Sequence, residues 1–373
     1  MNSDSSRVKS GFGFSKPVKV PVSTDAMTSL ESIIQNRIDA EPGLRESMSL
    51  YDELRQFDIV VSSMSSVEQS IRIPPQQLQA IQRKRERAKE LQLQYGLSHL
   101  AVHNKLQEIT WDAAAASRHH RHQEAQSAPK TNSNKAKKTP PLRVSDAMTA
   151  HMLSLAEWAV GMDTNSHESD KTRFILDVGC GTGLLCNYLK QFTSSTSNSN
   201  SGSSNTNNNK KKVSTSSSAL HASIDRAADD SSSQSVSVKV FGVDFSGEMV
   251  KIAQESHPDA TFVQTDFLQY IPPPEVGSFD RIIFNESLHN FLNVEDTLRY
   301  AATLLNTKTG RILLSNPKGF AGIVTQRAVN QWLSPSLLPN SQELELLADQ
   351  LNLQLLRAPD TTSPHYLAVL ATR

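Results

Sequence analysis

The chain has 373 residues, a length that suits one large domain or two of ordinary size. Lysine plus arginine and aspartate plus glutamate both total 38, and the resulting zero net charge excludes a globally basic nucleic-acid binder. The sequence contains no apolar run of membrane-spanning length, and two cysteines are too few for a disulfide scaffold, so we expect a reducing, intracellular compartment.

The N-terminal part is predicted to be helical. We interpret residues 1–24 as a flexible tail, and apolar residues at helical spacing predict a helical extension over residues 25–116. Pro42-Gly43 ends the first of these helices, and Ser98 is placed to cap a later one. Residues 117–144 are polar and basic, and we interpret them as a linker.

Two features of this part resemble ligand sites, and each has a simpler interpretation. Glutamates dilute the basic run Arg83–Arg87, so we expect a solvated helix face rather than an RNA-binding surface. His119, His120 and His122 have no cysteine or acidic partner at ligand spacing, so we expect a solvated helix end rather than a metal site. We therefore predict neither a nucleic-acid partner nor a metal.

Residues 145–373 alternate between strand and helix patterns, which predicts an α/β domain with a mostly parallel sheet covered by helices on both faces. The strand candidates are Arg173–Val178, Val238–Val243, Ala260–Val263, Arg281–Phe284, Arg311–Ser315, Leu351–Arg357 and Tyr366–Thr372. The segment 358–365 is too short for a parallel crossover, so the seventh strand should run antiparallel. A serine- and asparagine-rich segment at 193–237 interrupts the pattern, and we interpret it as a disordered insertion.

The clearest motif is an apolar strand that runs into a glycine-rich turn and then a helix, over residues 174–185. Glycine permits positive φ and close approach of a ligand, and the helix N-terminus offers free N–H groups. The G-x-G-x-G spacing lacks the third glycine of a dinucleotide fingerprint, and the lysine of a P-loop is absent, so NAD and ATP are disfavoured. Asp177 before the turn suits a cationic ligand with an amino-acid moiety better than a pyrophosphate.

The segment Asp177–Gly183, DVGCGTG, resembles the first motif of class I S-adenosylmethionine-dependent methyltransferases. Segments similar to the family's second to fifth strands follow in order at Val240–Asp244, Phe262–Phe267, Phe279–Asn285 and Gly310–Ser315. The resemblance covers residues 145–373 apart from the insertion. It implies a Rossmann-like, seven-strand, mostly parallel sheet with an antiparallel last strand, and S-adenosylmethionine as cofactor.

The resemblance also implies which residues bind the cofactor. Asp244 would bind the ribose hydroxyls, and Asp266 would accept from the adenine amino group. Capping of a helix by Asp244, or of a turn by Asp266, is the plainer alternative for each acid. The full implied set is Asp177, Gly179, Cys180, Gly181, Gly183, Asp244, Phe245, Met249, Asp266, Phe267 and Asn285.

The loop after the fourth strand, Asn285–Phe291, lies where this family carries groups that act on the acceptor. It has neither the Pro-Pro signature of amide methylation nor a catalytic cysteine, and it is similar to the Leu-His motif of many small-molecule methyltransferases. We therefore predict His289 as a base or an orienting group and Glu286 as a contact to acceptor or cofactor. A buried structural histidine is the alternative for His289.

The sequence thus predicts S-adenosylmethionine-dependent methyl transfer to an unidentified acceptor, expected to be a small molecule. The alternative is a cofactor-binding scaffold or pseudo-enzyme that acts through its N-terminal helices. Segments at 315–319, 337–339 and 366–370 are similar to plant and algal methyltransferase-like proteins of undefined substrate. We expect a cytoplasmic location, with a plastid as the alternative.

Overall fold

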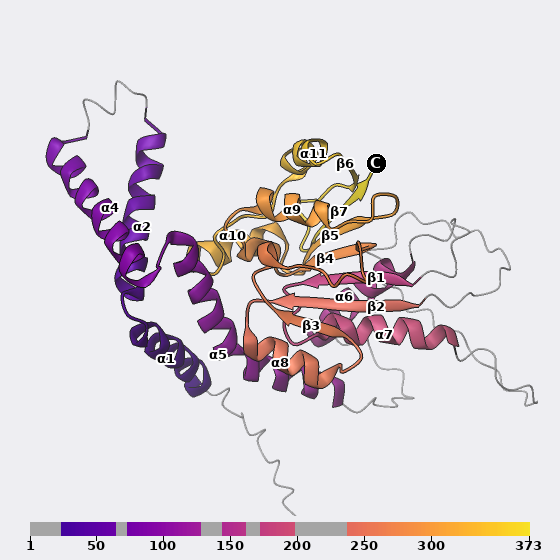
Figure 1. Cartoon of the computed structure of the whole chain (residues 1–373). Helices are drawn as coiled ribbons and strands as arrows, with labels where there is room; N and C mark the ends of the chain where they lie inside the picture. Colours follow the sequence, from indigo (N-terminus) through magenta and orange to yellow (C-terminus); the bar gives the residue numbers. More distant parts are fainter. Residues whose placement is uncertain (1–23, 65–72, 128–143, 162–171, 198–236) are drawn as a thin grey trace, which may run out of the picture.

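The computed structural model describes residues 24–64, 73–127, 144–161, 172–197 and 237–373 (Figure 1). The predicted tail and nearly all of the predicted insertion lie outside these ranges, as does residue range 128–143 of the predicted linker. The side chains of His119, His120 and His122 also lie outside the description.

One seven-stranded sheet organises the C-terminal domain, in the order β3-β2-β1-β4-β5-β7-β6. Strands β1 to β5 pair in parallel, and β7 pairs antiparallel with both β5 and β6. The Rossmann-like prediction, with an antiparallel last strand, is therefore confirmed. The strands are β1 (Arg173–Val178), β2 (Val238–Asp244), β3 (Thr261–Gln264), β4 (Arg281–Asn285), β5 (Arg311–Asn316), β6 (Leu353–Arg357) and β7 (Tyr366–Thr372).

Helices cover both faces of the sheet. Successive strand residues point to opposite sides, so the strands contribute apolar side chains to two cores, one under each layer of helices. Ile283 packs in the core shared with α6 (Val144–Gly161), α7 (Leu184–Ser197) and α8 (Gly247–Ser256). Ile282 packs on the opposite face, in the core shared with α9, α10 and α11. These last helices are α9 (Val294–Thr303), α10 (Gly319–Val329) and α11 (Ser341–Gln350), and short 3-10 turns follow β3 (η2, Phe267–Gln269) and β4 (η3, Leu288–Asn290).

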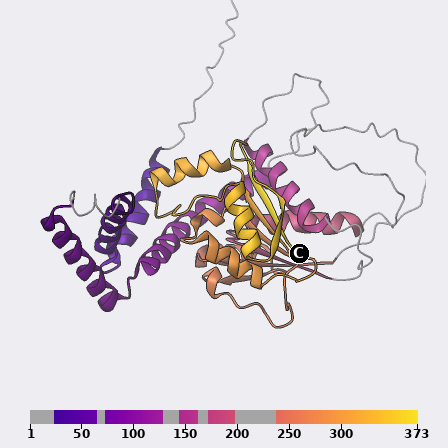
Figure 2. The ribbon, with the colours of Figure 1, turned by 90° about the horizontal axis from the view of Figure 1, so that it is seen from above.

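In the described part of the N-terminal extension the chain forms four helices: α1 (Thr24–Ala40), α2 (Leu44–Ser62), α4 (Pro75–Tyr95) and α5 (His99–Ser127). Ser98 caps α5 as predicted, since its Oγ accepts from the Ala101 N–H at 3.1 Å. Helix α5 runs past residue 116 into the segment that composition predicts as a linker. In both views α2 and α4 project away from the sheet, whereas α5 returns to it (Figures 1 and 2).

Helix α5 joins the two parts because it has two different faces. Val102, Leu106 and Ile109 are buried in the apolar cluster that α5 shares with α1 and α2. Its polar side chains instead reach the C-terminal domain, where α5 packs against α8. Among the described helices, none has the length and apolarity that a membrane span requires.

Candidate functional site

The candidate site lies along the edge of the sheet where the parallel strands end. Strand β1 is central to this edge. The chain adds β2 and β3 on one side of β1 and then crosses to the other side to add β4 and β5, so the order of the strands switches direction at β1. Open α/β sheets bind ligands in the crevice outside the strand ends at such a switch point.

The glycine turn after β1 is tied to β2, since the N–H groups of Gly179 and Cys180 donate to the Val243 carbonyl at 2.8 and 3.1 Å. All three glycines of the motif have positive φ, 73° at Gly179, 52° at Gly181 and 78° at Gly183. A Cβ on Gly179 would lie 2.5 Å from Ser287 Cβ, and one on Gly183 would lie 2.8 Å from a ring carbon of His257, the residue that follows α8. A Cβ on Gly181 would meet no atom within 4 Å of the described residues, so Gly181 leaves room for a ligand.

Asp244 at the end of β2 holds this turn. Its Oδ2 accepts from the Gly181 N–H at 2.8 Å, and its Oδ1 accepts from the Ser246 N–H at 2.9 Å. Helix α8 is capped instead by Ser246, whose Oγ accepts from the Met249 N–H at 3.1 Å. The capping alternative for Asp244 is therefore wrong, and its carboxylate lies beside the open space at Gly181.

Asp177 lies in the strand directly beneath the turn and is 4% exposed. Burial raises the pKa of its carboxyl to about 7, and the nearby Asp244 carboxylate adds to this shift. A buried carboxyl with this environment would be stabilised in its ionised form by a cationic ligand group. Cys180 is also buried, and burial raises the pKa of its thiol, which disfavours a thiolate nucleophile.

Asp266 at the end of β3 has both carboxylate oxygens engaged. Oδ1 accepts from the Leu268 N–H at 3.0 Å and caps η2, which confirms the capping interpretation. Oδ2 accepts from the Asn104 side chain of α5 at 3.2 Å. Asp112 of the same helix accepts from the Ser246 hydroxyl and from the Glu248 N–H. Helix α5 thus borders the site at the ends of β2 and β3.

The apolar residues predicted near the cofactor are buried to different extents. Met249 and Phe267 are 1% and 3% exposed, and Phe267 packs edge-on against Phe284 and Tyr300. Phe245, directly after Asp244, is only half-buried. Of the three, Phe245 has surface for a ligand, whereas Met249 and Phe267 support the site from the interior.

The loop after β4 places Glu286 and His289 in different surroundings. Glu286 has a left-handed φ of 56°, and its N–H donates to the Ser315 carbonyl at 2.9 Å. His289 is 4% exposed, and its Nε2 lies 3.2 Å from the Gln326 amide nitrogen. An amide nitrogen only donates, so Nε2 accepts and the ring proton is on Nδ1, which has no partner among the described residues. Burial, with a smaller contribution from Lys318, lowers the pKa of His289 to about 4.

A second group of polar residues meets at the ends of β4 and β5, and only its Asn285 was predicted. His151 of α6 places Nε2 3.1 Å from Asn285 Oδ1 and 2.9 Å from Ser315 Oγ. The His365 ring, just before β7, stacks on the His151 ring with centroids 6.2 Å apart. In the sequence His151 is only a histidine among the apolar residues of a helix, a pattern more typical of a core position.

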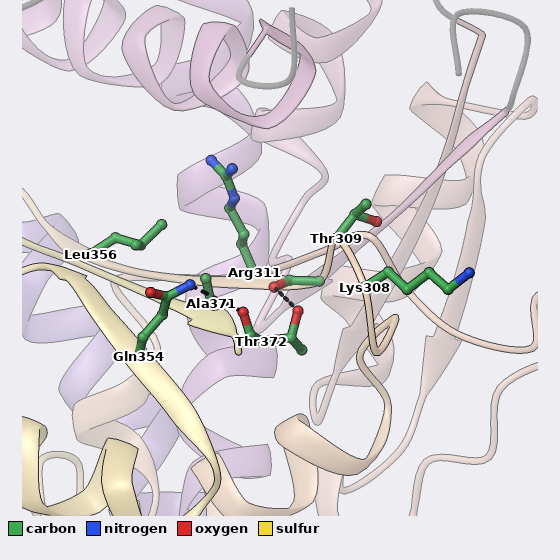
Figure 3. Close-up of a pocket in the computed structure, with 8 residues that line it drawn as sticks. Lys308, Thr309, Arg311, Gln354, Leu356, Ala371 and Thr372 are labelled. Atoms are coloured by element: carbon green, nitrogen blue, oxygen red, sulfur yellow. Dashed lines mark hydrogen bonds between the residues drawn. The ribbon is translucent and has the colours of Figure 1, made fainter. Parts of the chain in front are cut away.

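A pocket of about 190 Å³ lies at the opposite end of the sheet (Figure 3). It is formed where β5 begins and β7 ends, with Arg311, Gln354 and Thr372 among its lining residues. The Gln354 amide donates to the Thr372 carbonyl at 3.2 Å, and the Thr372 N–H donates to the Gly310 carbonyl at 3.0 Å. This pocket is remote from the carboxyl ends of β1 and β2, where the glycine turn and Asp244 lie, and its Gln354, Thr372 and Gly310 groups bond to one another.

Residues 150–358 match a family model described as a methyltransferase domain. No curated protein matches the sequence significantly. Among solved structures, magnesium protoporphyrin IX methyltransferase from Synechocystis PCC 6803, with bound S-adenosylhomocysteine, has 14% identity and a TM-score of 0.42, and the match covers 71% of this chain and 98% of that one. The N-methyltransferase NodS from Bradyrhizobium japonicum WM9, also with S-adenosylhomocysteine, has 11% identity and a TM-score of 0.37, over 61% of this chain and 87% of that one.

Proposed function

This chain belongs to the methyltransferase-domain family, and from that premise we propose that it transfers a methyl group from S-adenosylmethionine bound over the glycine turn at the ends of β1 and β2. The observation that carries the placement is the space at Gly181, where a positive φ and an open Cβ position lie beside the Asp244 carboxylate. A backbone that only glycine adopts easily, facing open space, is what close approach of a ligand requires.

The residues of the site fit the chemistry of this cofactor. Asp177 would pair with its ammonium group, which would relieve the cost of a buried carboxylate. Asp244 would accept from the ribose hydroxyls and Asp266 from the adenine amino group, with Phe245 against the adenine. Gly179, Gly183, Cys180, Met249, Phe267 and Asn285 would shape the surrounding wall.

S-adenosylmethionine supplies a methyl group already activated on a sulfonium sulfur, so the chain must mainly align the acceptor and exclude water. Alignment of this kind lowers a barrier by roughly 7–11 kcal/mol in well-oriented systems. We assign Glu286 to contact the acceptor and His289 to orient it, since the neutral His289 ring carries an Nδ1–H without a partner among the described residues.

The acceptor that we propose is a small molecule. Helix α5 lies across the loop after β4, where the His103 ring donates from Nε2 to the Asn290 carbonyl at 2.9 Å. His103 is itself 4% exposed, so this contact is part of a packed interface. A folded macromolecule would have to displace α5 to reach the loop, whereas a small acceptor would not.

Calorimetry with S-adenosylhomocysteine tests the cofactor site. Asp244→Ala removes a charge-assisted contact worth roughly 1.5–3 kcal/mol, so affinity should fall about ten- to a hundredfold. The matched control is Asp349→Ala, which removes an exposed acid of α11 that pairs with Arg373. Equal affinities for the Asp244→Ala variant and the parent chain would overturn the placement.

A further inference from the structure

The hydrogen-bond network around His151 fixes which nitrogen of its ring carries the proton. The Asn285 amide nitrogen donates to the Met152 sulfur at 3.5 Å, so the amide oxygen Oδ1 faces His151 and Ser315. The Ser315 hydroxyl donates to that oxygen at 3.3 Å. Ser315 Oγ then presents only lone pairs toward His151 Nε2, and Oδ1 also only accepts. Nε2 must therefore carry the hydrogen, which leaves Nδ1 as the basic nitrogen.

This basic nitrogen has no hydrogen-bond partner among the described residues, although His151 is only 8% exposed. Two titratable groups face the ring. The Glu286 carboxylate, across the end of β4, raises the pKa of His151, and the stacked His365 lowers it. Burial is the largest influence and lowers the pKa of His151 below its usual value, although the hydrogen bond with Asn285 raises it, so the net direction favours the neutral ring.

His289 lacks this arrangement. Its Nε2 lone pair already accepts from Gln326, and its Nδ1 carries the ring proton. To take up another proton, His289 would have to lose the bond from Gln326. Of the two histidines at the end of β4, His151 is the one with an unused lone pair.

We propose that His151 is the proton acceptor of the transfer reaction, through Nδ1, and that the methyl acceptor reacts at an oxygen or nitrogen that carries a proton at neutral pH. Asn285 and Ser315 are positioning residues, because they hold the ring in the Nε2–H tautomer. A carboxylate acceptor needs no base and would be repelled by Glu286. This inference rests on the proposed function.

The proposed step balances in atoms and charge. The hydrogen–oxygen or hydrogen–nitrogen bond of the acceptor breaks, and its proton forms the new N–H bond at Nδ1. The freed lone pair forms the bond to the methyl carbon, and the electron pair of the carbon–sulfur bond stays on sulfur. One positive charge thus moves from the sulfonium to the imidazole.

Nitrogen-15 NMR of the full chain, without cofactor, tests the tautomer. The signals of His151 are identified by their absence in His151→Gln. We expect the Nε2–H tautomer at pH 8, a lower His151 pKa in Glu286→Gln and a higher one in His365→Ala. An Nδ1–H tautomer at pH 8 would overturn the proposal, because the basic nitrogen would then be the one facing Asn285.

Methyl transfer tests the catalytic role and the acceptor class. The probe is S-adenosylmethionine with a labelled methyl group, incubated with the chain and an extract of the source cells. His151→Gln should lower label transfer at least a hundredfold, the lower end of general-base contributions of about 10²–10⁴. Affinity for S-adenosylhomocysteine should stay within twofold of the parent, and the control His99→Gln, outside the site, should leave transfer unchanged.

Two outcomes separate this inference from the proposed function. The label should resist mild base, because ethers and methylamines survive a treatment that releases methanol from methyl esters. Methylamines are then separated from ethers by their retention on a cation exchanger in acid. Release as methanol would overturn the acceptor class.

The transfer rate should also fall as the pH is lowered, and in Glu286→Gln this fall should occur at a lower pH than in the parent chain. Full transfer by His151→Gln would overturn the base while leaving the cofactor site intact, whereas failure of the parent chain to bind S-adenosylhomocysteine would overturn the proposed function itself.

Discussion

Asn104 in the N-terminal extension donates a hydrogen bond to Asp266 at the end of β3, across 3.2 Å and 162 positions of sequence. Eight residues further along α5, Asp112 bonds to Ser246 and to the first turn of α8. The N-terminal helices are therefore built into the edge of the sheet that holds the proposed cofactor site. Asp266 is shared between this contact and the adenine contact that we propose for it.

Replacement of Asn104 by Asp should detach α5 from the domain. The variant places a second carboxylate against the half-buried Asp266 and removes a donor, and a hydrogen bond to a charged group contributes about 1.5–3 kcal/mol. Hydrogen exchange of the α5 amides should accelerate, and the melting temperature should fall by several degrees. The control Gln94→Glu makes the same change on an exposed position of α4. Unchanged exchange in Asn104→Asp would show that the bond to Asp266 does not hold α5 in place.

The open space at Gly181 has a matched control in the chain. Gly181 and Gly277 both have positive φ, 52° and 63°, and at either position an added Cβ would meet no atom of the described part of the chain within 4 Å. Alanine should strain the two backbones alike, by about 1 kcal/mol. Only Gly181→Ala should also weaken S-adenosylhomocysteine in calorimetry. Equal affinities for the two variants would place the ligand away from the turn.

Asp177→Asn should make the unliganded chain more stable at pH 8 and weaken cofactor binding. The folded-state pKa of about 7 lies above the ordinary value near 3.8, so the folded chain binds a proton that the unfolded chain has lost. Stability of the parent therefore falls as pH rises from about 4 to 7, and asparagine removes this loss. Urea unfolding at pH 8 and pH 4 should show the gain at pH 8 alone. A variant that is less stable than the parent at pH 8 would contradict this account of Asp177.

His289 should contribute to acid sensitivity in the opposite sense. Its pKa of about 4 lies below the ordinary value of 6.5, so the unfolded chain binds the extra proton as the pH falls through this range. Stability should therefore decrease from pH 6.5 to pH 4, and less steeply in His289→Gln. His289→Ala should be destabilised at every pH, because the half-buried Gln326 loses an acceptor and the buried ring of His289 is removed. Neither variant should change S-adenosylhomocysteine affinity, which calorimetry would check.

The seven strands, the glycine turn and the antiparallel β7 were all predictable from the sequence. Each depends on a local pattern: the burial of a short apolar run, a backbone conformation that needs glycine, or a connection too short for a crossover. The end of α5 was not predictable in this way, since its polar last turns carry no apolar periodicity. The cap on α8 also differed. Ser246 and Asp244 are both good capping residues, and in the fold the Asp244 carboxylate accepts from the N–H groups of Gly181 and Ser246 while Ser246 caps the helix.

Only the tertiary structure brought His151 to Asn285 and Ser315, and Asn104 to Asp266. These partners are 134, 164 and 162 positions apart, and no local pattern in the sequence connects them. The strand order places β4 and β5 side by side, and the packing of α6 on that face then carries His151 to their ends. Local sequence sets which residues are buried and where the chain turns. The meeting of distant side chains depends on how strands and helices pack together, and for this protein that packing leaves the lone pair of His151 Nδ1 free beside the site.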